Sequence, residues 1–584
     1  MPTRAERENV VERRPAGGAR RSACPLVFRR MSTVNCYTTP WLSMTIDEYD
    51  YIVVGAGSAG CVLANRLTAD GETSVLLLEA GTPDDDRNMR IPAAFPELFK
   101  TDADWEYYTE PQDGCAGREL YWPRGKTLGG CSSTNAMIYI RGHPSDYDGW
   151  AELGNDGWGY DSMLEYFRRA ETFEPTDSSY HGDEGPLNVT DQSSPRPASE
   201  AFVRAAAQAG YDRNDDFNGA EQAGVGLYHV TQKNGKRHSA ADAYLKPALD
   251  RSNLTAETGA RVTEVTVEDG RATGVKYSRD GEARSVDATE EVLVSAGAVN
   301  SPQILMLSGI GDPDHLADHG IDVEAASPGV GRNLQDHLFA FTVYETDDDV
   351  STLDDAGSLR DLFNWFVRKR GKLTSNVGEA GGFVRTDPDE PRPDLQFHFA
   401  PSYFMEHGLA NPEEGRGLSI GATQLRPESR GRVRLSSTDP FEAPAIDPNY
   451  LNERADLETL VEGVKRAREI ADQDALSEYL GRELWPGEDV ETDEEIARHV
   501  REECHTVYHP VGTCKMGDDP AAVVDDELRV RGVEGLRVVD ASVMPTLVGG
   551  NTNAPTIAIA ERAADLIRED RPATAEGPLS AAGD

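Results

Sequence analysis

The sequence has little positive charge, and lysine contributes little of what there is. Its 584 residues hold 58 basic side chains against 102 acidic ones, a formal net charge of −44, and only about ten of the basic residues are lysine. Such a surface repels nucleic acid and acidic membranes, which excludes a nucleic-acid-binding role. The acidic residues are dispersed rather than gathered in one block. This pattern predicts a cytoplasmic protein adapted to a high-salt cell, where ions screen the repulsion.

Cysteine is also scarce, and long apolar runs are missing. The seven cysteines are an odd number, widely scattered, with no CxxC pair. This excludes a disulfide framework and a zinc site, so we expect no metal and a reducing compartment. No apolar run reaches the roughly 18 residues of a membrane-spanning helix. Peripheral membrane association and a homo-oligomeric state are both left open.

The two ends of the chain differ from the rest in composition. Residues 1–46 are rich in arginine although the chain as a whole is acidic. The pair Arg20-Arg21 suggests a twin-arginine export signal, but the apolar run at 25–28 is too short for one. We therefore predict a disordered extension over 1–46, with Met44 a candidate for the natural start, and a disordered tail over 571–584.

The rest of the chain is organised around a strand, a turn and a helix near residue 50. Residues 51–54 are an apolar run typical of a buried strand, and three glycines at GxGxxG spacing follow before a segment of helical period. In a dinucleotide-binding turn, Gly55 permits the tight turn and Gly57 lets backbone approach a pyrophosphate. Gly60 lets the helix pack on the strand. The motif alone does not separate FAD from NAD.

Two further segments extend this cofactor site. A second apolar strand at 74–79 ends in Glu79, at the distance expected for a carboxylate that binds ribose. Residues 123–135 are dense in glycine and hydroxyl groups and contain two cations. We predict that they form a second cofactor-binding turn that leads into a helix.

The order of strands and helices predicts an α/β fold of two domains. The first is a Rossmann-like cofactor-binding domain with a parallel sheet plus a β-meander, and the second is an α+β substrate domain built on an antiparallel sheet. The predicted cofactor domain comprises residues 47–150, 196–340 and 500–570. The predicted substrate-binding domain comprises residues 151–195 and 341–499.

Three motifs together resemble the glucose–methanol–choline (GMC) oxidoreductase family, particularly its choline and alcohol dehydrogenase members. They lie at 125–135, at 297–311, and at 509–514 with 551–556, and the resemblance covers about residues 48–568. It implies that the cofactor is FAD. It also implies oxidation of a primary alcohol, choline or a related small alcohol, to the aldehyde by hydride transfer to flavin N5.

The resemblance also implies roles for individual residues. His509 matches the base that accepts the hydroxyl proton, and Asn553 matches the second active-site position, which is His or Asn in the family. An imidazole is a suitable base near neutral pH. His505, four residues earlier, is an alternative base. His143 and His337 lie on predicted loops and are expected to be structural or near the cofactor.

The glycine turns and the resemblance together predict the FAD contacts. Val262 would place its backbone near the adenine, and Asp540 would bind the polar chain of the cofactor, with a strand-end cap as its alternative role. Thr134 stands where some members attach FAD through a histidine, so the resemblance implies non-covalent FAD. The predicted FAD-binding residues are Gly55, Gly57, Ser58, Gly60, Glu79, Gly125, Leu128, Gly129, Gly130, Ser132, Asn135, Val262, Asp540, Ala541, Asn551, Pro555 and Thr556.

Several alternatives remain at this point. An H₂O₂-producing oxidase, a flavin-containing lyase and a nicotinamide-binding protein share the same turn. The electron acceptor is open among a quinone, an artificial acceptor and O₂. A choline site needs aromatic and acidic groups around the ammonium. Tyr403, Phe404 and Glu406 are candidates for these groups.

Overall fold

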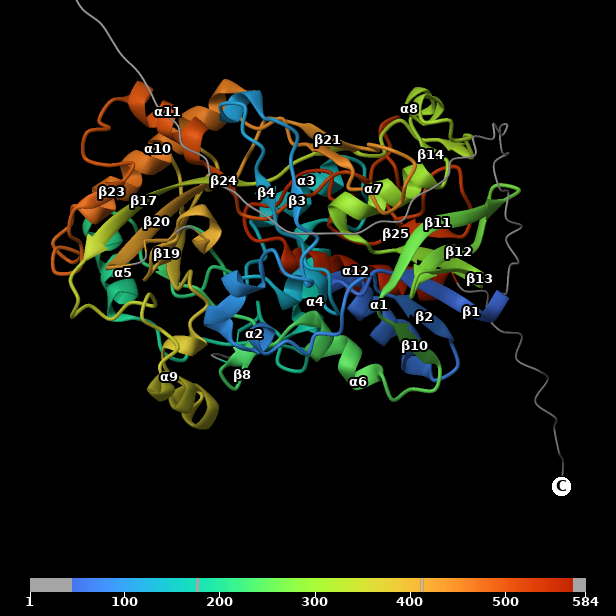
Figure 1. Ribbon diagram of the computed structural model, residues 1–584, viewed down its shortest axis with the longest axis horizontal. Helices are drawn as coiled ribbons and strands as arrows, with labels where there is room; N and C mark the ends of the chain where they lie inside the picture. Colours follow the sequence, from blue (N-terminus) through green and yellow to red (C-terminus); the bar gives the residue numbers. More distant parts are fainter. Residues whose placement is uncertain (1–44, 175–177, 410, 413, 571–584) are drawn as a thin grey trace, which may run out of the picture. The chain divides into compact units, whose positions relative to one another are not determined.

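The apolar run at residues 51–54 is a central strand of a sheet, as predicted (Figure 1). The computed structural model describes residues 45–174, 178–409, 411–412 and 414–570. β1 pairs in parallel with β2 and β13, while β11, β12 and β13 are antiparallel neighbours. The first sheet, in the order β10-β2-β1-β13-β12-β11 with β25 beside β13, consists of β1 (Thr45–Val54), β2 (Val75–Leu78), β10 (Leu254–Glu257), β11 (Ala260–Glu268), β12 (Arg271–Arg279), β13 (Glu282–Val294) and β25 (Leu536–Val538). This confirms the predicted parallel sheet with its β-meander.

A second sheet is antiparallel, as predicted for the substrate-binding part. In Figure 1 it lies on the left, and the first sheet lies on the right. In the order β23-β17-β20-β19-β18-β7, with β24 beside β17, it consists of β7 (Gly224–Leu227), β17 (Leu338–Thr346), β18 (Ala380–Val384), β19 (Leu395–Ala400), β20 (Arg416–Gln424), β23 (Glu483–Trp485) and β24 (His505–Thr506). The short strands outside both sheets are β3 (Tyr107–Tyr108), β4 (Tyr121–Trp122), β5 (Glu171–Phe173), β6 (Leu187–Val189), β8 (Gln232–Lys233), β9 (Lys236–Arg237), β14 (Ile310–Gly311), β15 (Ala325–Ala326), β16 (Arg332–Leu334), β21 (Gly431–Arg434) and β22 (Ala445–Asp447).

Helices bury their apolar faces against the two sheets. α1 and α12 share a core with the first sheet, and α5 and α10 share a core with the second. The helices are α1 (Ser58–Leu67), α2 (Arg87–Arg90), α3 (Pro144–Glu152), α4 (Tyr160–Ala170), α5 (Pro197–Gln208), α6 (Lys246–Ala248), α7 (Gly297–Leu307), α8 (Pro313–Asp318), α9 (Leu359–Phe363), α10 (Arg454–Ala471), α11 (Asp493–Glu503) and α12 (Asn553–Glu569).

The packing corrects the predicted domain boundaries. Residues 151–195 were assigned to the substrate-binding domain, but the buried side chains of α4, β5 and β6 belong to the core of the first sheet. Conversely, α5 and β7 fall in the segment 196–340 assigned to the cofactor domain, yet they pack on the second sheet. The apolar pattern of a short helix shows that one face is buried, but not which sheet buries it, so the sequence could not decide.

One local prediction is also corrected. The second glycine turn does not lead into a helix: residues 130–133 form a single 3-10 turn, and a non-helical segment follows it. The predicted N-terminal extension and C-terminal tail lie outside the described residues, except that β1 already begins at Thr45.

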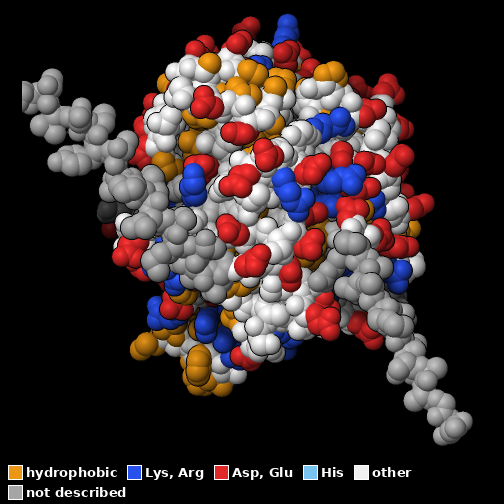
Figure 2. Space-filling model, turned by 90° about the vertical axis from the view of Figure 1, so that its right-hand side faces the viewer, with side chains coloured by type: hydrophobic (Ala, Val, Ile, Leu, Met, Phe, Trp, Pro, Cys, Tyr) orange, Lys and Arg blue, Asp and Glu red, His pale blue; other side chains and the backbone are white. Residues whose placement is uncertain are grey.

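The surface and the thiols match the composition. Asp and Glu side chains are scattered over the face shown in Figure 2, without one acidic block. Of the cysteines in the described ranges, Cys61, Cys115, Cys131, Cys504 and Cys514 are free thiols. Among the same residues, no helix has the length and apolar character needed to cross a bilayer, and no cluster of side chains is arranged to bind a metal ion.

Candidate active site

The first glycine turn is shaped by close backbone contacts. Gly55 has φ +98°, and a Cβ atom on it would lie 2.6 Å from the carbonyl oxygen of Ser295. A Cβ atom on Gly60 would lie 1.9 Å from the carbonyl oxygen of Gly55, so only glycine lets α1 pack this close to the turn. A Cβ atom on Gly57, by contrast, would come no closer than 3.9 Å to the Ser295 carbonyl oxygen, and Gly57 lines the cavity described below. These roles are the ones that the motif predicts.

The second glycine turn lies against the first. The amide of Gly129 donates to the carbonyl of Ala56 at 2.7 Å. A Cβ atom on Gly130 would lie 2.8 Å from Cα of Gly57, and a Cβ on Gly125 would lie 2.4 Å from the Gly130 carbonyl. The two turns therefore form one cradle of exposed backbone, which side chains larger than hydrogen would fill.

Two carboxylates near the ends of strands accept hydrogen bonds from backbone amides around the cavity, and Glu79 does so within the cradle. Glu79 accepts hydrogen bonds from the amides of Ala56 at 2.8 Å and Gly81 at 2.7 Å, and burial raises its pKa to about 7. Asp540 accepts from the amides of Gly297 and Ser542, both at 2.8 Å. Asp540 therefore fills the capping role that the sequence left open, while both carboxylates also lie on the cavity wall.

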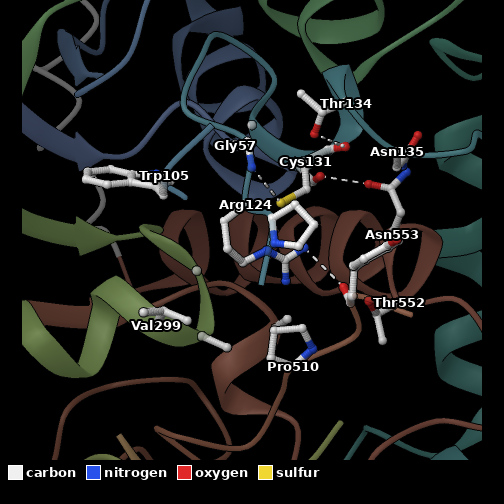
Figure 3. Close-up of a pocket in the computed structure, with 18 of the residues that line it drawn as sticks. Gly57, Trp105, Arg124, Cys131, Thr134, Asn135, Val299, Pro510, Thr552 and Asn553 are labelled. Atoms are coloured by element: carbon white, nitrogen blue, oxygen red, sulfur yellow. Dashed lines mark hydrogen bonds between the residues drawn. The ribbon is translucent and has the colours of Figure 1, made fainter. Parts of the chain in front are cut away.

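One continuous cavity joins the cradle to His509 (Figure 3). Arg124, Pro510, Thr552 and Asn553 surround it from separate parts of the chain, with Trp105 at another side. The predicted residues that line it are Gly55, Gly57, Ser58, Glu79, Gly125, Gly130, Asn135, Val262, His509, Asp540, Ala541, Asn551, Asn553 and Thr556. The predicted residues that do not line it are Gly60, Leu128, Gly129, Ser132 and Pro555.

The cavity suits a long cofactor with polar and apolar parts. The buried hydroxyl of Ser295 lines it and has no hydrogen-bond partner among the described residues. α12 begins at Asn553 and presents its N-terminus there, where the helix dipole favours negative charge. A backbone cradle, an unpaired hydroxyl and a helix N-terminus are what a dinucleotide needs along its length.

His509 lies at the other end of the cavity and is held from three sides. Its backbone amide donates to Asp336 at 2.7 Å, its Nδ1 lies 3.0 Å from Nδ1 of His337, and its Nε2 lies 3.2 Å from Nδ2 of Asn551. The side chain is buried, and this burial, with His337 and His398 nearby, holds its pKa well below the usual range. His509 is therefore a neutral imidazole at neutral pH.

The partners of His337 decide which His509 nitrogen is protonated. His337 Nε2 faces only the carbonyl of Leu425, at 3.2 Å, so this nitrogen must donate. In a neutral ring its Nδ1 then accepts, so Nδ1 of His509 donates and Nε2 of His509 is the unprotonated nitrogen with the lone pair. The Asn551 amide nitrogen donates to that lone pair, and its oxygen accepts from Gln396 at 3.2 Å. The arrangement presents a basic nitrogen to the cavity.

The partner of His509 is Asn551 and not Asn553, which corrects the predicted pairing. Asn551 was predicted to contact the cofactor, and Asn553 was predicted to be the second catalytic residue. In the structure, Asn553 Oδ1 accepts from the hydroxyl of Ser58 at 2.7 Å, on the cofactor side of the cavity. The two asparagines are separated by one residue at the start of a helix. Because the chain turns there, their side chains point in different directions, and the sequence does not fix which one meets His509.

His505 does not line the cavity. Its ring stacks on Phe341 with centroids 5.4 Å apart, and burial lowers its pKa well below the usual value. These contacts are those of a buried structural residue rather than of a base at the cavity. His143 caps α3 by accepting from Ser145, which is also a structural role. His337, expected to be structural or near the cofactor, touches His509 directly.

One end of the cavity is aromatic. Its rings are Phe95, Phe99, Phe339, Phe341, Phe404 and Tyr508. Of the residues considered for an ammonium cage, Phe404 lines the cavity, but Tyr403 and Glu406 do not. Sequence reasoning missed Arg124, which lines the cavity and donates to the carbonyl of Tyr508 at 3.0 Å. The only sequence signal for it was its place in the second glycine motif.

Comparisons with known proteins identify relatives over nearly the whole described chain. Family models for GMC oxidoreductases match residues 49–339 and 427–560. An alcohol dehydrogenase [acceptor] of Pseudomonas putida is 47% identical over 528 residues, which cover 89% of this chain and 95% of that protein. The mitochondrial choline dehydrogenase of Homo sapiens is 46% identical over 535 residues, covering 89% and 90%. The crystal structure of pyridoxine 4-oxidase from Mesorbium loti superposes with a TM-score of 0.82 at 34% identity, covering 90% of this chain and 100% of that one.

Proposed function

Because this chain belongs to the GMC oxidoreductase family, we propose that it is an FAD-dependent dehydrogenase that oxidises a primary alcohol to its aldehyde. FAD, when bound, supplies the acceptor for the hydride that leaves the alcohol carbon. The two glycine turns, Ser295 and the N-terminus of α12 would hold FAD. Thr134 lines the cavity where a histidine would be needed for covalent attachment, which supports non-covalent binding.

The observation that best supports this function is the position of His509, which lines the cavity and whose unprotonated Nε2 faces the Asn551 amide at 3.2 Å. An alcohol hydroxyl that enters competes with the Asn551 amide for this nitrogen and gives its proton to it. The displaced Asn551 amide can then donate to the alcohol oxygen and so keep it in position. The aromatic rings around this point exclude water, which favours transfer of a hydride over side reactions.

We further propose that the substrate is a neutral alcohol with an apolar body. Among the described cavity-lining residues, the carboxylates are Glu79 and Asp540, and both are committed to backbone amides. Near His509 the charged lining side chain is Arg124, a cation. A quaternary ammonium there would meet aromatic rings and a like charge, whereas an apolar group would meet only favourable contacts.

Flavin reduction in the absence of oxygen tests the function directly. A panel of aliphatic, aromatic, sugar and choline-type alcohols should bleach the flavin absorbance of the purified holoenzyme. His509→Ala should slow this step by about 10²–10⁴-fold while FAD stays bound, because the proton acceptor is lost. Bleaching at the wild-type rate in His509→Ala would remove His509 from this role, and a protein that no alcohol bleaches would refute the function.

The electron acceptor and the cellular setting are proposals of the same kind. Turnover in air without an added acceptor, with H₂O₂ formed, would indicate an oxidase like the structurally similar pyridoxine 4-oxidase. We propose instead a quinone-type acceptor, consistent with the P. putida relative named for a separate acceptor.

The net charge of −44 supports a location in a high-salt cytoplasm, and full stability of the protein without added salt would contradict this proposal.

A further inference from the structure

The segment that begins with α9 exposes a row of large apolar side chains. α9 continues without a break into a π-helical turn over Asn364–Arg368, and α9 projects at the bottom of Figure 1. The exposed side chains are Leu359 (87%), Phe363 (53%), Phe366 (68%) and Val367 (57%). Their spacing is that of an apolar helix face, which in a globular protein normally packs on a core. Here it faces solvent.

The opposite face of this segment is firmly attached to the protein. Trp365 is buried, packs with Ile91 and Leu373, and donates from Nε1 to the carbonyl of Gly235 at 2.8 Å. The exposed row is therefore held outward by a packed inner face. The other exposed large apolar side chains of the described residues lie singly on separate elements, such as Leu153 and Leu249.

The same segment is a basic island in an acidic protein. Residues 359–372 hold five basic side chains and one acidic one, whereas the whole chain has 58 basic and 102 acidic residues. The basic residues are Arg360, Arg368, Lys369, Arg370 and Lys372. Figure 2 shows hydrophobic and Lys or Arg side chains gathered together at the lower left of the view.

We propose that residues 359–372 dock the enzyme on the surface of an anionic lipid bilayer. The four exposed apolar side chains would enter the acyl boundary, and the flanking cations would meet the anionic headgroups, as in interfacial amphipathic helices. A second copy of the chain fits this face less well, because a twofold contact would bring the same cations together.

Docking at this point would place the cavity beside the bilayer. Ile91, which packs on Trp365, immediately precedes the 3-10 segment Pro92–Leu98. That segment contains Phe95, which lines the cavity. An apolar substrate or acceptor dissolved in the membrane would then be close to the aromatic end of the cavity.

The net charge of the chain does not prevent this contact in high salt. At an ionic strength of about 1 M the Debye length is about 3 Å, so the long-range repulsion of acidic membranes expected from the sequence is screened. Burial of apolar side chains is not weakened by salt in this way. Binding should therefore persist, or become stronger, as salt rises.

Vesicle flotation of the full-length holoenzyme at about 1 M salt tests the proposal. Vesicles of phosphatidylcholine mixed with phosphatidylglycerol are compared with vesicles of phosphatidylcholine alone. The double variant Leu359→Ser/Phe366→Ser should bind the mixed vesicles at least about tenfold less than wild type, because two exposed apolar anchors are lost. The matched control Leu153→Ser/Leu249→Ser removes two exposed apolar side chains elsewhere and should bind like wild type.

Charge is tested separately with Arg368→Ser/Arg370→Ser. Direct contacts between cations and headgroups lie within about one Debye length, so this variant should lose the preference for phosphatidylglycerol and retain weaker binding to both vesicle types. Equal binding by wild type and the Leu359→Ser/Phe366→Ser variant, or no binding by wild type, would overturn the proposal. The face would instead be assigned to a second copy of the chain by two results together. Wild type would not bind vesicles, and it would form a dimer in size-exclusion chromatography that the Leu359→Ser/Phe366→Ser variant does not form.

Discussion

Nδ1 of His337 lies 3.0 Å from Nδ1 of His509, and this contact sets which nitrogen of His509 is free to act as a base. Burial lowers the pKa of His337 to about 3, so it stays neutral and can only accept at Nδ1 while its Nε2 donates to Leu425. His337 does not line the cavity. It is a positioning residue that acts through His509.

His337→Phe should therefore slow flavin reduction by about ten- to a hundredfold, because His509 can then adopt either tautomer. FAD binding should be unchanged, since no part of His337 lines the cavity. His337→Gln offers a matched control: its amide can donate to the Leu425 carbonyl and accept from His509. Stopped-flow reduction rates that are equally slow in both variants would indicate a packing role only.

The two asparagines at the start of α12 should have separable effects. Asn551→Ala removes the donor that faces His509 Nε2, so it should lower the rate of flavin reduction by roughly tenfold or more with FAD retained. Asn553→Ala removes the acceptor of the Ser58 hydroxyl and should weaken FAD binding more than it slows chemistry. Titration of the apoprotein with FAD and single-turnover kinetics measure the two effects. The reverse pattern would restore Asn553 as the catalytic partner.

The backbone geometry of the first glycine turn could be predicted from the sequence because its motif is local. Gly55, Gly57 and Gly60 are required by contacts within one strand–turn–helix, and the structure places them as the spacing implies. The choice between Asn551 and Asn553 depends on how one helix start meets a histidine about 40 residues away, which spacing does not encode. His337 illustrates the same limit, because its loop position gave no sign of contact with His509.

The substrate domain was predicted less well for a related reason. Its antiparallel sheet combines β7 with strands more than 100 residues later in the chain, and only tertiary packing shows that pairing. The aromatic end of the cavity is likewise built from segments near 95, 340, 404 and 508. No single stretch of sequence contains enough of it to suggest a substrate.

The fold should be sensitive to mild acid. Burial holds several histidines neutral in the folded chain, with pKa values lowered to about 3 for His337 and His407 and about 4 for His398. The unfolded chain protonates them near pH 6.5, so it binds more protons below that pH and stability falls. Each such histidine contributes up to roughly 1.4 kcal/mol per pH unit.

Two buried carboxyls oppose this trend in part. Burial raises the pKa of Glu79 to about 7 and of Asp336 to about 6, so the stability they contribute is lost as pH rises through those values. The histidines outnumber them, and the melting temperature should fall between about pH 6.5 and pH 5. His398→Gln should flatten the fall, and a melting temperature that rises on acidification would contradict the argument.

Close packing at Gly60 gives a prediction for the cofactor turn. Gly60→Ala places a methyl group 1.9 Å from the Gly55 carbonyl oxygen and forces α1 away from the turn. We expect a loss of roughly 1–3 kcal/mol in stability together with weaker FAD binding. Gly149→Ala is the control: it lies within α3 with nothing within 4 Å, so it should be neutral or stabilising. Chemical denaturation of both variants with and without FAD distinguishes the outcomes.

The preference for a neutral alcohol can be tested with one pair of substrates. Choline and 3,3-dimethylbutan-1-ol have the same shape and differ in the charge at one atom. Cation–π contacts with the aromatic rings would stabilise bound choline by about 0.5–2 kcal/mol. Bringing an unpaired cation out of water costs several kcal/mol, and Arg124 adds repulsion.

The cost of removing choline from water exceeds the cation–π gain. The kcat/KM for flavin reduction should therefore be at least about a hundredfold higher with the neutral alcohol than with choline, since each 1.4 kcal/mol is a factor of ten. Phe404→Glu places a carboxylate in the lining at a half-buried position and should shift the ratio toward choline. Phe404→Gln introduces a side chain of the same shape as glutamate but without its charge, so it should leave the ratio unchanged. Flavin reduction by choline as fast as by its neutral isostere in the wild-type enzyme would show that the rings alone suffice to bind the cation.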